Sequence, residues 1–292
     1  MKIFRLLLAD MKLGGILKKG YPALVLLCAF YAYFFHIFTE NLKNIYGIEG
    51  AGLGDLLAFV HCGTIPCIRM IQQRDFQISF MWLALIMYEM ALPLSYPVSA
   101  MENWGYPFVM KTGRRQWWLS KCLYTMGINL ISMLLETGTF FICCLIFRLD
   151  TDLRWHTRIA EIIFGGADGS GQILTQGQNI FLLIGAPTLG IMATSMVLLV
   201  MSVSFGRTTA YVIGTAWLVA SVFTIHPLLP GNCTMAIRSS LIDVEGMTPL
   251  TQIFSCAGII VSAVCFGTVE IRRKDFCRLN HAGSILEHEE DN

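Results

Sequence analysis

The stretch GYPALVLLCAFYAYFFHIFT, residues 20–39, contains no Asp, Glu, Lys or Arg. A helix rises 1.5 Å per residue, so twenty such residues extend about 30 Å, the thickness of the hydrocarbon core of a bilayer. A helix is the form expected there, because lipid cannot satisfy exposed backbone donors and acceptors. The stretch therefore predicts a membrane-spanning helix.

The rest of the chain has the same character. Of its 292 residues, 55% are hydrophobic and 14% are charged, with a mean hydropathy of +0.60, whereas a soluble protein carries about 25% charged residues. The strands of a membrane barrel would need alternating polarity, which these runs lack. We therefore predict an all-α polytopic membrane protein. Its charge-poor runs place six transmembrane helices at residues 21–38, 78–100, 120–147, 180–204, 208–228 and 250–270.

Fourteen of the 21 Lys and Arg residues fall on one side of such a six-helix protein. They lie before the first span, between the second and third spans, at Arg207, and after the sixth span. The positive-inside rule assigns that side to the cytoplasm, so we expect both termini to be cytoplasmic. The net charge of +1 gives no indication of nucleic-acid binding.

Three regions follow from this topology. Residues 1–20 predict a cytoplasmic interfacial amphipathic helix, because Phe4, Leu7, Leu8 and Met11 fall at helical spacing among basic residues. The transmembrane domain covers residues 21–275, and the acidic cytoplasmic tail covers residues 276–292. The spans are joined by a cytoplasmic loop at 101–121 and by external loops at 39–77, 148–179 and 229–249.

The segment 53–68 is ambiguous. It is fairly apolar but short for a span, and it contains Asp55, His61 and Pro66. It fits an external or membrane-dipping helix, or a seventh span that would place the termini on opposite sides. Charge asymmetry favours six spans, since seven would scatter the basic clusters over both faces. Cys62 and Cys67 could form an external disulfide, although three external cysteines give no even framework.

The sequence predicts no catalytic or metal site and no bound cofactor, and it lacks the glycine-rich motif of P-loop ATPases. Glu89 and Glu136 are acids deep within predicted spans, where an ionisable group is costly and marks a candidate translocation site. A packing role between helices is the alternative. Pro93 and Pro97 should kink the second span, because proline lacks a backbone donor.

The most specific segment is ENWGYPFVMKTGRRQWWLSK, residues 102–121, between the second and third spans. Its order, an acid followed by Gly-x-Arg and then Lys, resembles the cytoplasmic loop in the membrane subunits of type-2 ABC exporters, especially Firmicutes peptide and multidrug systems. The N-terminal amphipathic segment, six spans, long first external loop, HPLLPG at 226–231 and EIRRKD at 270–275 are also similar to that family.

The resemblance implies a permease subunit in the bacterial cell membrane. Such a subunit pairs with a second permease, identical or related, and with separate ATPase subunits that bind ATP and Mg. It would export a peptide, a lipid-like molecule or a drug, and it is not itself an enzyme. The resemblance assigns an ATPase-coupling role to the following residues: Glu102, Lys111, Thr112, Gly113, Arg114, Arg115, Trp117, Trp118 and Lys121.

Two other functions remain open at this point. A proton-coupled secondary transporter would use Glu89 and Glu136, although no internal repeat of the kind such folds often carry is evident. The second alternative is a non-transporting membrane protein, such as an immunity factor or a sensor. An accompanying ATPase would distinguish the exporter from both.

Overall fold

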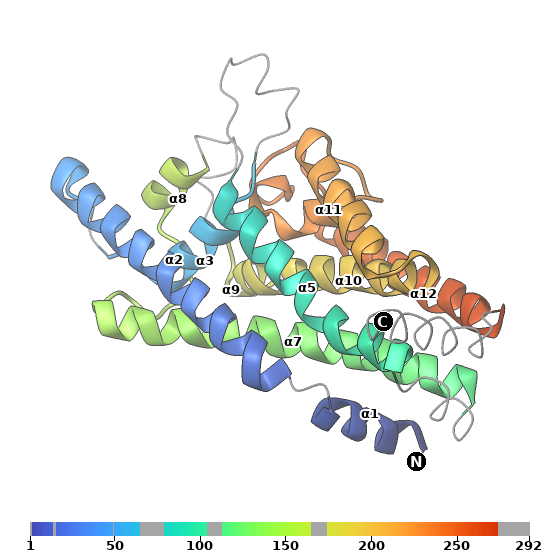
Figure 1. The fold of residues 1–292 in the computed structure, drawn as a ribbon. Coiled ribbons are helices and arrows are strands. Elements are labelled where there is room, and N and C mark those ends of the chain that lie inside the picture. Colours follow the sequence, from blue (N-terminus) through green and yellow to red (C-terminus); the bar gives the residue numbers. More distant parts are fainter. Residues whose placement is uncertain are drawn as a thin grey trace, which may run out of the picture.

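The computed structural model describes residues 2–13, 16–48, 50–64, 79–103, 113–164 and 174–273, and these residues contain helices but no strand (Figure 1). Two isolated bridges, Gly52 with Asp150 and Ser239 with Met247, are the extent of β-pairing among them. The larger helices are α1 (Lys2–Leu13), α2 (Ile16–Tyr46), α5 (Phe80–Asn103), α7 (Arg114–Phe147), α10 (Ala186–Phe205), α11 (Arg207–Phe223) and α12 (Pro249–Arg273). The shorter ones are α3 (Leu53–His61), α8 (Thr157–Ile163), α9 (Gln176–Ile180), the π-helix η1 (Phe181–Gly185) and the 3-10 helices η2 (Pro230–Thr234) and η3 (Ala236–Arg238).

Four of the described helical segments are long and apolar enough to cross a membrane: Gly20–Tyr46, Arg114–Phe147, Gln176–Phe205 and Pro249–Arg273. They carry many exposed apolar side chains, such as Leu26, Leu134 and Phe254, as expected of a surface in contact with lipid. The prediction of an all-helical fold with apolar helices of membrane-spanning length is confirmed to this extent. The predicted spans at 78–100 and 208–228 correspond to α5, whose apolar part is Phe80–Ala91, and to the 17-residue α11.

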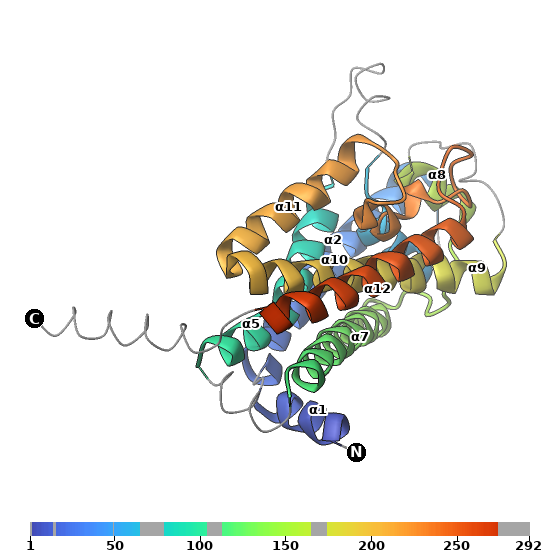
Figure 2. The ribbon, with the colours of Figure 1, turned by 90° about the vertical axis from the view of Figure 1, so that its right-hand side faces the viewer.

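The helix α10 is the centre of the bundle. It packs against α5, α7, α11 and α12, and it lies among them in both views (Figures 1 and 2). Towards its N-terminus, α10 is continuous with η1 and α9. This run begins at a capping box, in which the side chain of Thr175 accepts a hydrogen bond from the backbone N–H of Gln178. The π-turn ends at Gly185, two residues before Pro187, which has no N–H to donate to the carbonyl one turn earlier and so interrupts the regular pattern of helical hydrogen bonds.

Several helix boundaries differ from those predicted. The helix α2 covers Ile16–Tyr46 instead of 21–38, so it includes the end of the predicted N-terminal helix and the start of the predicted external loop. The helix α7 begins at Arg114 rather than at residue 120, so the end of the predicted cytoplasmic loop belongs to its first two turns. Gly113 sits before it with a φ of 87°, a conformation that glycine adopts readily. The helix α11 ends at Phe223, earlier than residue 228, because Thr224 turns to an extended conformation shortly before Pro227.

The helix α3 covers only Leu53–His61, so it extends about 13 Å and cannot cross a membrane alone. It packs against α2, α5, α7 and α8 and is almost completely buried. Gly54 is needed there, since a Cβ at this position would collide with the backbone of Leu153 and Arg154. Of the two readings of residues 53–68, the described part therefore fits a short packed helix rather than a seventh span.

The bundle has two distinct ends. At one end, which we call the basic end, lie α1, the beginning of α7 and the end of α12. Figures 1 and 2 both show α1 against the first turns of α7. At the other, which we call the loop end, lie α3, α8 and residues 224–248 between α11 and α12. The tertiary structure thus gathers three of the four basic regions of the sequence at one end.

Candidate functional site

The basic end carries the described part of the segment that resembles an ATPase-coupling loop. Arg115 is exposed, and Arg114 is half-buried and donates a hydrogen bond to the carbonyl of Arg272 at the end of α12. Gly113 is exposed before them. This contact joins the first turn of α7 to the last turn of α12.

The two tryptophans of this segment point into the bundle. Trp117 is 2% exposed and Trp118 is completely buried. The Trp118 indole donates a hydrogen bond of 3.1 Å to the carbonyl of Val264, and its ring lies where a side chain on Gly267 would be. Trp118 fixes α7 to α12, and an exposed role as docking anchors does not match the position of either tryptophan.

Lys121 is likewise an interior residue, 2% exposed. Its ammonium forms a 2.7 Å ion pair with Asp10 of α1, which is itself 3% exposed. The same carboxylate accepts hydrogen bonds from the hydroxyls of Tyr96 in α5, at 2.8 Å, and Ser120, at 2.6 Å. The ammonium also lies 4.4 Å from the centre of the Tyr96 ring, within range of a cation–π interaction.

We call Asp10, Tyr96, Ser120 and Lys121 the Asp10 cluster. It joins α1, α5 and α7, and the charge of Asp10 is balanced by that of Lys121. Buried charges are tolerated when they are paired and hydrogen-bonded in this way. The predicted amphipathic helix is therefore held to the bundle by a specific polar contact, whereas Phe4 and Leu8 of its predicted apolar face are exposed.

The remaining residues of the segment are only partly described. Glu102 lies in the last turn of α5, and Lys111 and Thr112 lie outside the described residues. Of the nine residues assigned to coupling, Arg114 and Arg115 are therefore the described side chains that reach the surface, whereas three are buried in the bundle.

A second polar cluster lies in the interior. Glu89 of α5, Glu136 of α7 and His61 of α3 are completely buried, and we call them the acid cluster. Nε2 of His61 lies 2.9 Å from Oε1 of Glu136. Glu89 interacts with the carboxyl of Glu136, and the described residues offer its own two oxygens no donor. Among the described residues, three of the four oxygens of the two carboxyls therefore have no donor.

The fold thus brings together the two acids that the sequence singled out, from different helices. In the sequence, His61 is one of the polar residues of the ambiguous segment 53–68, and Asp10 is an isolated acid in the N-terminal helix. No local pattern joins His61 to Glu136, which is 75 residues away. The sequence feature that could have indicated this pairing is the ionisable residue itself. A lone ionisable group in an apolar segment is costly to bury, so it needs a partner from elsewhere in the fold. Pro93 and Pro97 lie within α5, beyond Glu89 towards the basic end.

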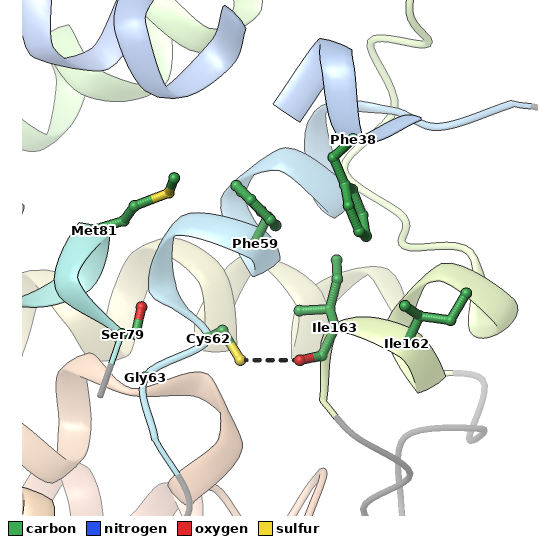
Figure 3. A pocket seen from close by; sticks show the side chains of 8 residues that line it. All are labelled: Phe38, Phe59, Cys62, Gly63, Ser79, Met81, Ile162 and Ile163. Atoms are coloured by element: carbon green, nitrogen blue, oxygen red, sulfur yellow. Dashed lines mark hydrogen bonds between the residues drawn. The ribbon is translucent and has the colours of Figure 1, made fainter. Parts of the chain in front are cut away.

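The loop end contains a cavity of about 310 Å³ between α2, α3, α5 and α8. Figure 3 shows Phe38, Phe59 and Ile163 around it, with the thiol of Cys62 directed at the Ile163 carbonyl. The Cys62–Ile163 hydrogen bond is 3.4 Å long, and burial raises the pKa of this thiol to about 12. Cys67, its possible disulfide partner, lies outside the described residues.

A larger apolar groove of about 790 Å³ runs along α10, α11 and α12. Its lining is almost entirely aliphatic and aromatic, with serines as its polar side chains. It extends from Leu228 at the loop end to Phe205 and Phe266 towards the basic end. An apolar chain, or the apolar face of a helix, has room to pack in this groove along most of the length of the bundle.

Comparison with known proteins finds no relative: no family model, no curated protein and no solved structure matches this chain. The class is therefore defined by the fold, which is that of a helical membrane protein with four described helices of membrane-spanning length and apolarity.

Proposed function

We propose that the chain is the transmembrane permease subunit of a bacterial ABC exporter. In this proposal α2, α5, α7, the run from α9 to α10, α11 and α12 are six spans, and the basic end faces the cytoplasm. A separate ATPase binds ATP and Mg and docks at the basic end, and a second permease completes the pathway. The protein lies in the plasma membrane.

The observation that carries the proposal is the construction around Arg114 and Arg115. These cations stand at the start of a 34-residue helix, beside the end of α12. Below them, Trp118 fixes α7 to α12 and Lys121 fixes it to α1. Arginine on a rigid base is a favourable anchor for a protein interface, because little conformational entropy is lost on binding. A movement of the ATPase would then be passed to three helices.

The groove along α10, α11 and α12 supports an apolar or amphipathic cargo, such as a peptide, a lipid-like molecule or a drug. Its lining offers burial rather than charge recognition. The same surface suits the second permease, so the groove favours an apolar contact without selecting one cargo.

The first experiment is purification of the tagged chain from its native membrane, followed by mass spectrometry. We expect a P-loop ATPase to be recovered with it. Arg114→Glu with Arg115→Glu should abolish this recovery, because it reverses the charge at the proposed interface. The matched control is Arg154→Glu with Arg158→Glu, two exposed arginines near the loop end, which should leave it intact. Recovery that survives the first double substitution contradicts the docking assignment.

Labelling with a membrane-impermeant maleimide tests the orientation separately. In intact cells, Arg115→Cys should gain no label over the parent protein, and Arg158→Cys should gain one. The reverse result would exclude the proposed orientation.

The acid cluster supports a second candidate, a proton-coupled transporter, because two carboxyls and an imidazole meet in the interior. Transport that persists without ATP but stops when the proton gradient is dissipated would favour this function over the exporter. Binding to a peptide or a kinase without any transport would favour the immunity or sensor function.

A further inference from the structure

The residues between α11 and α12 fold back over the bundle and bring two cysteines together. Cys233 lies in η2 and Cys256 lies about two turns into α12. Their sulfur atoms are 3.4 Å apart. Cys233 is 2% exposed and Cys256 is completely buried, so the two thiols face each other in the interior.

Hydrogen bonds made by the residues next to each cysteine hold Cys233 close to Cys256. Next to Cys256, the hydroxyl of Ser255 donates a hydrogen bond to the carbonyl of Pro227. Next to Cys233, the backbone carbonyl and hydroxyl of Thr234 both accept from the Trp82 indole, at 3.2 and 2.9 Å. The segment is therefore tied to α12 on one side and to α5 on the other.

The helix α10 also favours this approach. A Cβ on Gly190 would lie 2.6 Å from the Thr234 side chain and 2.8 Å from the Pro230 carbonyl oxygen. The missing side chain lets η2 rest directly on α10, beneath α12. The backbone thus holds Cys233 close to Cys256 through packing as well as hydrogen bonds.

The surroundings of the pair are apolar. Cys233 and Cys256 form a small cluster with Ala193 and Met247. Among the described residues, no group of three or more His, Cys, Asp and Glu could hold a metal ion. Each thiol therefore has the other as its reactive neighbour.

We propose that Cys233 and Cys256 form a disulfide that fastens the segment 224–248 to α12. The inference does not depend on the transport function. A disulfide requires a sulfur–sulfur distance of about 2.05 Å, so the two atoms must approach by about 1.4 Å. Rotation of the two side chains, with a small movement of η2, supplies this approach.

The oxidant is a low-molecular-weight disulfide. One cysteine thiolate attacks it, breaking its S–S bond to form a mixed disulfide and release one thiolate. The second cysteine thiolate then attacks the mixed disulfide at the protein sulfur and releases the other. The two cysteines lose two electrons and two protons, and the donor becomes two thiols. Because both cysteines are buried, exchange requires transient opening of the segment.

The sequence favoured no such pairing, because Cys256 falls inside a predicted span and counts there as a small apolar residue. In the six-span orientation the segment 224–248 faces outward, where disulfides persist. Cys256 supplies the partner for Cys233, whereas the Cys62 thiol is directed at a backbone carbonyl.

The test uses the full chain in membranes, incubated with oxidised glutathione a few degrees below its unfolding midpoint and then quenched with N-ethylmaleimide in SDS. Mass spectrometry without reduction should find the Cys233 and Cys256 peptides linked. The oxidised protein should melt roughly 5 °C above the reduced one. Cysteines that carry glutathione or N-ethylmaleimide, and not each other, would overturn the proposal.

Two variants sharpen this result. Cys256→Ser should lose the linkage and the rise in melting temperature together. Cys265→Ser removes an exposed cysteine from the same helix and should retain both. The linkage in the unaltered protein is measured directly, so the test stands even where Cys256→Ser fails to fold.

Discussion

The Asp10 cluster and the acid cluster both bury charged groups between helices, but they are built differently. In the first, one carboxylate receives an ammonium and two hydroxyls, so charge and hydrogen bonds are balanced. In the second, only Glu136 pairs with the His61 imidazole, through Oε1, and Oε2 of Glu136 and both oxygens of Glu89 lack a donor among the described residues.

This difference distinguishes a cluster that stabilises the fold from one that is a candidate functional site. A balanced network fixes helices in place and gives no reason for a proton to move. Buried acids that lack donors are costly to keep in the interior, and such a cost is usually associated with function. We therefore assign the Asp10 cluster to mechanical connection and keep the acid cluster as the candidate translocation site.

The largest expected effect is on the Asp10 cluster. Lys121→Met should lower the free energy of unfolding in detergent by about 3–5 kcal/mol, because it leaves a buried carboxylate without its counter-ion. Asp10→Asn combined with Lys121→Met should recover much of this loss, since no charge is then left unpaired. Lys12→Met, at an exposed position on the same helix, is the control. An equal loss in single and double variants would show that charge balance is not what stabilises the cluster.

The next effect concerns His61 and Glu136. Glu136→Ala should cost about 1–3 kcal/mol in the same unfolding measurement, because Nε2 of His61 loses its partner in a buried site. Glu136→Gln keeps an acceptor oxygen and should cost less. If the two substitutions are equally destabilising, the hydrogen bond to His61 is not the source of the stabilisation.

A smaller effect is expected at Glu89. Glu89→Gln should change the free energy of unfolding by less than about 0.5 kcal/mol, because the amide has nearly the shape of the carboxyl and adds a donor where the two carboxyls lack one. Transport should nevertheless fall if Glu89 exchanges protons, and transport assays of this variant measure that directly. Unchanged transport together with unchanged stability would remove Glu89 from the candidate site.

The smallest effect tests a third buried acid, Asp55 of α3. Burial raises the pKa of this carboxyl, although hydrogen bonds from His156 and from the Gly52 amide oppose the rise. The folded state therefore binds this proton more tightly than the unfolded state does. The resulting stabilisation is complete below pH 3.8, the ordinary value, and is lost as the pH rises through the folded pKa. Asp55→Asn should flatten this part of the stability profile, and an unaltered slope would contradict the assignment.

Several of these features were accessible from sequence. The run 20–39 predicts a membrane-length helix because hydrocarbon demands internal hydrogen bonding, and α2 covers it. Glu89 and Glu136 stood out because an acid is rare in an apolar run. Helix ends were less accurate, since Arg114 to Ser120 carry polar groups that resemble a loop until Trp117 and Trp118 are seen to pack inside.

What the sequence by itself determined is therefore the class of fold and the positions at which burial is costly. Both depend on whether each side chain suits lipid or water, and the order of polar and apolar residues in the chain shows this directly. Only the tertiary structure decided which costly groups meet: Lys121 with Asp10, His61 with Glu136, and Cys233 with Cys256. These pairs are 111, 75 and 23 residues apart. Their contacts arise from helix packing, which local periodicity does not encode.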